Sequence, residues 1–168
     1  MAAKVTPEAP YPGSVTGARA FPRLRARDLQ GLDVDLPDAF AGERNVVVLA
    51  FRREHQDLVD AWLAWFEGRA ATDPALRFYE VPVIGRLWVP ARRFIDGGMA
   101  MAIRDPVVLQ RTFTVYGDVG RVTGPLGITD RSTVTICLVD PTGSVAWRGS
   151  GGPSPASESA LEAALAPG

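Results

Sequence analysis

The order of hydrophobic and polar residues predicts a chain in which strands alternate with helices. Val46–Phe51 is a valine-rich run without polar interruption, which is typical of a strand buried on both faces. Apolar residues then recur at helical spacing from Leu58 to Phe66, so we expect an amphipathic helix that Gly68 ends. Leu76–Val83 predicts a second core strand with Tyr79, Val81 and Val83 on one side.

The first third of the chain and its middle predict further elements. Phe21–Leu36 contains two alternating stretches split by Gln30-Gly31, which indicates a hairpin at an edge of the sheet. Arg86–Ile103 fits a helix that Pro90 and a Gly-Gly pair would bend, and a short helix begins at Asp105-Pro106.

Turn residues organise the C-terminal third. Thr112–Tyr116 predicts a third strand, and the glycine-rich Asp118–Ile128 predicts irregular structure. Asp140–Gly143 is the strongest hairpin signal in the chain and joins strands at Thr133–Val139 and Ser144–Trp147. A terminal helix over residues 156–166 would be capped by Ser154 or Ser157. This order predicts an α/β fold, a mixed sheet with helices on both faces.

Composition limits the organisation and the partners. The 168 residues, 46% of them hydrophobic, suit one domain over residues 21–166 behind a flexible leader at 1–20. A net charge of −1 does not favour nucleic acid as a partner. No apolar run approaches the roughly 18 residues of a membrane span, and the proline-containing N-terminus fits neither a signal peptide nor a transit peptide, so we expect a cytoplasmic protein.

Three local sequences resemble the thioredoxin superfamily. Val46–Phe51, with the polar turn and helix after it, is similar to the strand that delivers a redox Cys-x-x-Cys pair to a helix N-terminus. Leu138–Gly143 is similar to the "LIDxxG" hairpin of thiol-disulfide oxidoreductases, and Phe21-Pro22 with the Gly31 hairpin resembles their N-terminal addition. The resemblance implies a thioredoxin-like fold: a central mixed β-sheet flanked by helices, with an N-terminal β-hairpin.

A closer resemblance is to the mitochondrial ATP synthase assembly chaperones, thioredoxin-like proteins that lack the active-site cysteines. It rests on five pieces in order: Phe51–Gln56, Val59–Trp62, Tyr79–Val81, Tyr116–Asp118 and Val145–Gly149. In that family the client is a membrane subunit of ATP synthase. Because no transit peptide is recognised here, the resemblance implies an assembly-chaperone-like role with an unknown protein client.

Redox chemistry of the thioredoxin kind is not expected. That chemistry needs a cysteine whose pKa is lowered at a helix N-terminus, yet Gln56 and Val59 stand near the two cysteine positions of the superfamily. The superfamily also has a cis-proline before the strand that ends at the Asp140 hairpin, and residues 132–135 contain no proline. We therefore expect no catalytic residues and no cofactor.

The single cysteine, Cys137, leaves one enzymatic alternative open: a peroxiredoxin or thiol-oxidoreductase type of enzyme that uses this thiol alone. Its place between Ile136 and Leu138 in an apolar strand favours a buried, structural role, because burial raises a thiol pKa and blocks access. The single histidine, His55, has no second histidine at metal-ligand spacing, so no metal site is expected.

A polar segment after the first core strand is the main candidate binding site. It comprises Arg52, Arg53, Glu54, His55 and Gln56. Such a strand end is where α/β folds place sites, and a helix N-terminus with two arginines suits a small anion or a carboxylate of a partner protein. Alternatively the arginines are solvated, Glu54 pairs with one of them and His55 satisfies a local backbone group.

Aromatic residues extend this hypothesis. Trp62 and Phe66 are four residues apart and should face the core together, which would leave Trp65 partly exposed, and Trp88 lies near two prolines. Exposed aromatics beside arginine suit a protein-binding patch; the alternative is that all four tryptophans serve the core. The sequence therefore predicts a non-catalytic binding protein, with the Cys137 enzyme as the alternative.

Overall fold

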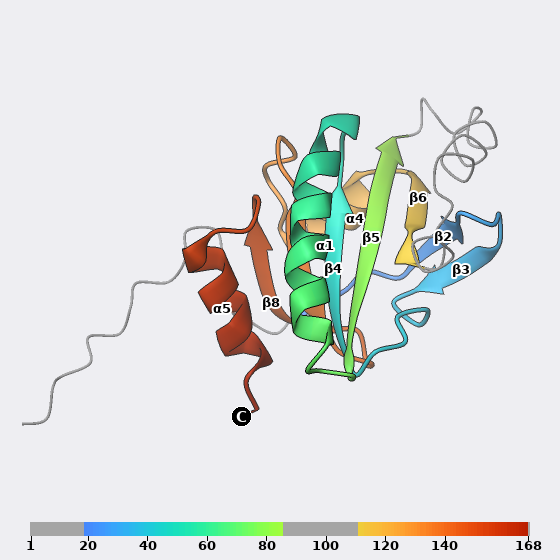
Figure 1. The fold of residues 1–168 in the computed structure, drawn as a ribbon. Helices are drawn as coiled ribbons and strands as arrows, with labels where there is room; N and C mark the ends of the chain where they lie inside the picture. The colour runs from blue at the N-terminus through green and yellow to red at the C-terminus, as the bar shows by residue number, and fades with distance from the viewer. Residues whose placement is uncertain (1–18, 86–110, 168) are drawn as a thin grey trace, which may run out of the picture.

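The computed structural model describes residues 19–85 and 111–167. In this part of the chain, eight strands form one sheet in the order β1-β8-β7-β4-β5-β6-β2-β3 (Figure 1). β4, β5 and β6 are parallel to each other, and the other neighbouring strands pair antiparallel. The strands are β1 (Arg19–Ala20), β2 (Leu24–Asp28), β3 (Asp33–Leu36), β4 (Arg44–Ala50), β5 (Leu76–Gly85), β6 (Phe113–Gly117), β7 (Thr135–Val139) and β8 (Ser144–Ser150).

Helices cover both faces of this sheet, as the sequence predicts. α1 (Gln56–Ala70) follows a single 3-10 turn, η1 (Arg53–His55), and lies with α5 (Pro155–Leu165) on one face. α4 (Gly120–Leu126) lies on the other face (Figure 1). The side chains of β4 point alternately to the two faces of the sheet. Val46 and Val48 face α1, whereas Val47 and Leu49 face α4. The prediction of a strand buried on both faces is confirmed.

The predicted strands and hairpins are present with shifted ends. β2 and β3 form the N-terminal hairpin, and β3 is an edge strand of the sheet. Tyr79, Val81 and Val83 of β5 enter the same core, as expected. At the β7–β8 hairpin, the Asp140 carboxylate accepts hydrogen bonds from the backbone N–H groups of Thr142 and Ser144, both at 2.9 Å.

Two predictions about helices are wrong. α1 does not end at Gly68 but continues to Ala70, because Arg69 pairs with Glu162 of α5 at 2.9 Å and Ala70 packs on the core. A glycine inside a helix costs about 1 kcal/mol, which these contacts offset. The segment from Asp118 is also not irregular: the Asp118 carboxylate accepts the Gly120 N–H at 2.8 Å, and α4 follows.

α4 forms despite its glycines and Pro125 because its inner face is apolar. Val122 and Leu126 are four residues apart and fully buried, so the helix is stabilised by the core rather than by its own propensity. Gly127 ends it with a φ of 63°, a left-handed conformation that favours glycine. At α5, Ser154 is the N-cap and Ser157 completes a capping box, so both predicted serines take part.

Some predictions fall outside the described residues. They are the bent helix at 86–103, the short helix at Asp105-Pro106, the placement of Trp88, and nearly all of the leader at 1–20. Within residues 19–85 and 111–167, no helix has both the length and the apolar composition needed to cross a bilayer.

Candidate functional site

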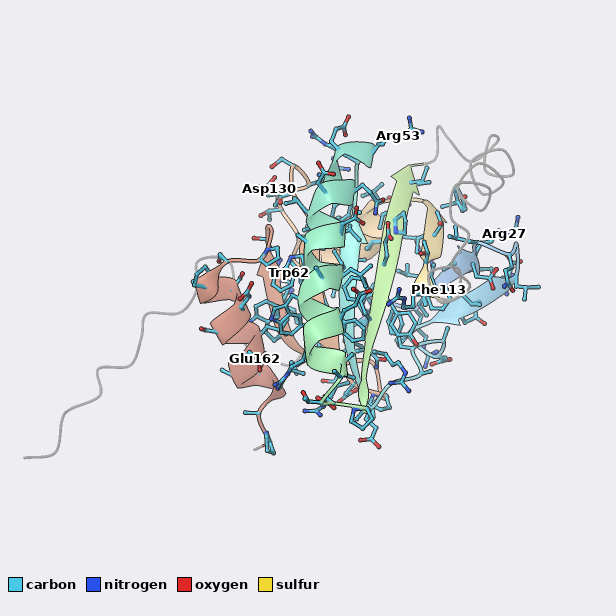
Figure 2. The ribbon with its side chains drawn as sticks, viewed as in Figure 1. Arg27, Arg53, Trp62, Phe113, Asp130 and Glu162 are labelled. Atoms are coloured by element: carbon cyan, nitrogen blue, oxygen red, sulfur yellow. The ribbon has the colours of Figure 1, made fainter. Side chains whose placement is uncertain are left out.

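The candidate segment lies at the junction between β4 and α1, which we call the β4–α1 junction and define as Arg52–Gln56. Arg52, Arg53, Glu54 and Gln56 are exposed, and Figure 2 shows Arg53 at the end of α1, beyond the carboxyl end of β4. The junction forms because Arg52 is still extended, with φ −144° and ψ 154°, and the chain then turns at once into η1 and α1. Four charged or amide side chains are therefore presented together at one end of the sheet.

The charges of this junction are largely unsatisfied within the described part of the chain. Neither Arg52 nor Arg53 forms an ion pair there, and Glu54 is not paired with either arginine, so the expectation of an internal Glu54–arginine pair is wrong. The arginines are solvated, as the alternative interpretation expected. Solvated, unpaired guanidinium groups are available to a carboxylate or phosphate from outside.

His55 supports the junction from inside. Its side chain is 3% exposed, and its Nδ1 accepts the backbone N–H of Phe51 at 3.1 Å, so the local backbone role is confirmed. Since Nδ1 accepts, the ring proton is assigned to Nε2, and this buried atom has no hydrogen-bond partner among the described residues. His55 thus fixes the turn between β4 and α1, while the residues around it make the surface.

Asp130 is a neighbour of the junction that the sequence analysis missed. It lies in the turn before β7, is exposed, and Figure 2 shows it beside the same end of α1. Hydrogen bonds from Ser132 lower the pKa of its carboxyl, with smaller contributions from Arg52 and His55. The Asp-x-Ser turn was visible in the sequence, but its nearness to Arg52 depends on the fold.

A second group of polar side chains begins at Gln56, whose Nε2 donates to Asp60 Oδ1 at 2.9 Å one turn along α1. Glu80 of β5 faces these residues. Its pKa is raised from 4.5 to about 7 because it is buried and because the Asp60 carboxylate is close, while a hydrogen bond with Gln56 and the charge of Arg111 oppose the rise. The sequence analysis missed Glu80, because its environment comes from packing of α1 on β5.

The aromatic residues do not all join this surface. Trp62 is fully buried and its Nε1 donates to the Gly151 carbonyl at 2.8 Å. Trp65 is half-buried, with its ring centre 5.8 Å from that of Trp62 in an edge-on arrangement. Trp65 is nine positions after Gln56 in α1, about 13 Å along the helix axis, so it is not part of the junction. Trp88, the other proposed aromatic, lies outside the described residues.

Cys137 lies in β7, an inner strand of the sheet between β8 and β4. It is fully buried in β7, and burial raises the pKa of its thiol to about 12, against a smaller opposing effect of Arg148. Val134, fully buried before β7, stands where the sequence analysis looked for a proline, and the cis peptide bond of the described residues is Leu36–Pro37, ahead of β4. Over the described residues, no three His, Cys, Asp or Glu side chains gather as metal ligands.

Comparisons with known proteins match this architecture to solved structures. No model of a protein family matches the chain, and no curated protein matches it in sequence. A Chlorobium tepidum protein assigned as the thiol:disulfide interchange protein DsbE superposes with a TM-score of 0.56 at 16% identity, covering 90% of this chain and 96% of that one.

Two further structures agree. BsSco, a member of the Sco family of cytochrome c oxidase assembly proteins, gives a TM-score of 0.57 at 13% identity, with 89% and 96% of the two chains covered. A thiol:disulfide interchange protein from a Bacteroides species gives 0.52 at 23% identity and 80% of each chain. At these identities the likeness shows the fold, and the resemblance to ATP synthase assembly chaperones stays a prediction. The chain has a thioredoxin-like fold.

Proposed function

We propose that this chain is a non-catalytic binding protein built on the thioredoxin-like fold, and that its partner surface is the β4–α1 junction together with Asp130. One observation carries the proposal. At the strand–helix junction where the sequence resemblance places a redox cysteine pair, this chain presents Arg52, Arg53 and Glu54, exposed and unpaired within the described residues. Such groups bind through charge-assisted hydrogen bonds.

The partner we propose is a protein, and the role is that of an assembly chaperone in the cytoplasm. Two things support this: the ordered resemblance to ATP synthase assembly chaperones, and the likeness in fold to BsSco, itself from a family of assembly proteins. The client segment carries carboxylates for Arg52 and Arg53, because two adjacent guanidinium groups fit carboxylates in a forked geometry. Those carboxylates must stay clear of Glu54 and Asp130, which are exposed on the same surface.

Burial of Cys137 counts against the enzymatic alternative. A thiol whose pKa is about 12 is almost wholly protonated at neutral pH, and the thiolate is the nucleophile in disulfide and peroxide chemistry. A fully buried sulfur is also closed to a second protein or to peroxide unless the sheet opens. The alternative predicts insulin-disulfide reduction or peroxide consumption that Cys137→Ser abolishes; our proposal predicts neither activity.

The test of the proposal is site-directed cross-linking in lysate of the source cells. A photoreactive amino acid at Gln56 should capture a distinct protein, and the double variant Arg52→Glu/Arg53→Glu should lose that product. The matched control is Arg23→Glu/Arg25→Glu, which reverses two arginines that are 79% and 74% exposed near the edge hairpin, far from the junction.

Three results would count against this proposal. One is capture that survives reversal of Arg52 and Arg53; a second is equal loss in the Arg23/Arg25 control, which would indicate a general charge effect. The third is a captured protein without an acidic segment at the cross-linked site. A simple anion site makes a different prediction: phosphate or sulfate alone raises the melting temperature, and Arg53→Ala removes the increase.

A further inference from the structure

A hollow of about 350 Å³ lies near the amino-terminal end of β5. The β4–α1 junction is at the opposite end of the sheet. The hollow is formed by the loop before β4 and the amino-terminal parts of β5 and β6, close to Phe113 in Figure 2. Its lining includes Ala39, Ala41, Arg77, Tyr79, Arg111 and Phe113. Its volume is within the range of small-molecule sites.

One wall of this hollow is aromatic and rigid. The rings of Tyr79 and Phe113 are stacked, with centres 5.3 Å apart and planes at 18°, and both side chains are buried. The Tyr79 hydroxyl accepts the backbone N–H of Ala41 at 2.8 Å, which fixes the loop before β4 against the ring. Phe40, which belongs to the same loop, packs on Tyr79 with the two ring centres 4.9 Å apart. The wall is therefore formed before any ligand arrives.

Two arginines supply the polar part of the lining. Arg77 is exposed, and its Nη1 donates to the carbonyls of Pro74 at 2.6 Å and Leu76 at 2.9 Å, which holds the guanidinium along the start of β5. Arg111 is half-buried and forms no ion pair with any described residue; it acts on Glu80 only through its charge. Among the described residues that line the hollow there is no carboxylate, and Arg77 and Arg111 supply its positive charge.

We propose that this hollow binds a small planar organic carboxylate, with its apolar ring against the Tyr79–Phe113 wall and its carboxylate between Arg77 and Arg111. The ligand ring packs against the small part of the Tyr79 and Phe113 side chains that reaches the hollow, since these side chains are 5% and 6% exposed. The carboxylate matches the two donors of a guanidinium. Inorganic phosphate would satisfy the arginines and leave the aromatic wall unused; a neutral aromatic would do the reverse. The inference is independent of the proposed function, because it uses none of the junction residues.

The experiment is a titration of the full chain with sodium benzoate, followed by calorimetry and by backbone amide NMR. Benzyl alcohol and inorganic phosphate are titrated in parallel as the neutral ring and the ringless anion. Arg77→Gln, Arg111→Gln and their double variant test the arginines, and Arg25→Gln on β2 is the matched control at an exposed arginine. Circular dichroism melting checks that every variant is folded.

We expect benzoate to bind and to shift the amide signals of Ala41, Tyr79 and Phe113. Each arginine variant should weaken binding about tenfold, the loss typical of a charge-assisted hydrogen bond, and Arg25→Gln should change nothing. Absence of benzoate binding up to the millimolar range overturns the proposal. So does equal binding of benzyl alcohol or phosphate, or unchanged benzoate affinity in the folded double variant.

Discussion

The β4–α1 junction and the centre of β7 are opposite in the two properties that thiol chemistry needs. The junction is exposed at the start of a helix, but it carries Arg52, Arg53 and Glu54 and no sulfur. β7 carries the sulfur of Cys137, but the side chain is fully buried and the thiol pKa is raised to about 12. Reactivity requires a thiolate and access at one place, and in the described structure the two are separated. The thioredoxin-like fold is therefore present here with arginines at the strand–helix junction and with the thiol inside the sheet.

The largest effect should follow from placing charge at each position. Cys137→Asp puts a carboxylate into the core, where desolvation of an unpaired charge costs several kcal/mol, so we expect an unfolded or strongly destabilised protein. Arg52→Asp at the solvated junction should fold normally. Urea denaturation followed by circular dichroism measures both, and equal stability of the two variants would contradict the contrast.

A smaller effect on stability should come from the titration of Glu80, which lies close to Gln56. Its pKa is raised in the folded protein from 4.5 to about 7, so the folded state holds this proton more tightly than the unfolded state. The stabilisation is complete below pH 4.5 and is lost as the pH rises to 7, by about 2 kcal/mol after allowance for partial solvent exposure. Glu80→Gln should remove this slope in urea denaturation across that range. A slope that persists in the variant would assign it to another group.

Removal of the His55 side chain should lower the free energy of unfolding by an intermediate to small amount. His55→Ala removes the acceptor of the part-buried Phe51 N–H, and the unpaired donor should cost about 1 kcal/mol because water reaches it in part. Increased hydrogen exchange at the Phe51 amide would locate the loss at the turn. A variant as stable as the parent, with that amide still protected, would show that His55 does not support the junction.

The smallest effect on stability is expected for Arg52→Glu/Arg53→Glu. Both side chains are exposed and unpaired within the described residues, so the free energy of unfolding should stay within about 0.5 kcal/mol of the parent value. Loss of partner capture with unchanged stability would separate binding from folding. A large destabilisation would show that the arginines serve the fold.

Sequence reasoning predicted the fold where local patterns and burial agree. Residues adjacent in sequence determine three of these features: the valine run of β4, the Asp140 turn and the Ser154 cap. It failed at α4, where glycines and Pro125 indicate a loop but Val122 and Leu126 are buried by the sheet. Propensity is a weak guide where tertiary packing supplies the stability.

The candidate site was predictable only as a segment. Arg52–Gln56 could be located because a buried strand ends there and a helix begins. Asp130 and Glu80 could not, since each comes close to the junction through contacts between distant elements. Trp65 was placed on the partly exposed side of α1 correctly, but the edge-on contact with Trp62 depends on how that helix packs.

The most direct test of the separation between thiol and surface is the reaction of Cys137 with a disulfide reagent such as dithionitrobenzoate in the native protein at pH 8. A thiol that is fully buried, with a pKa of about 12, should react only as fast as the protein unfolds, and denaturant should release the full reactivity at once. Rapid stoichiometric reaction of the folded chain would contradict the account, because it would place an accessible thiolate on the surface.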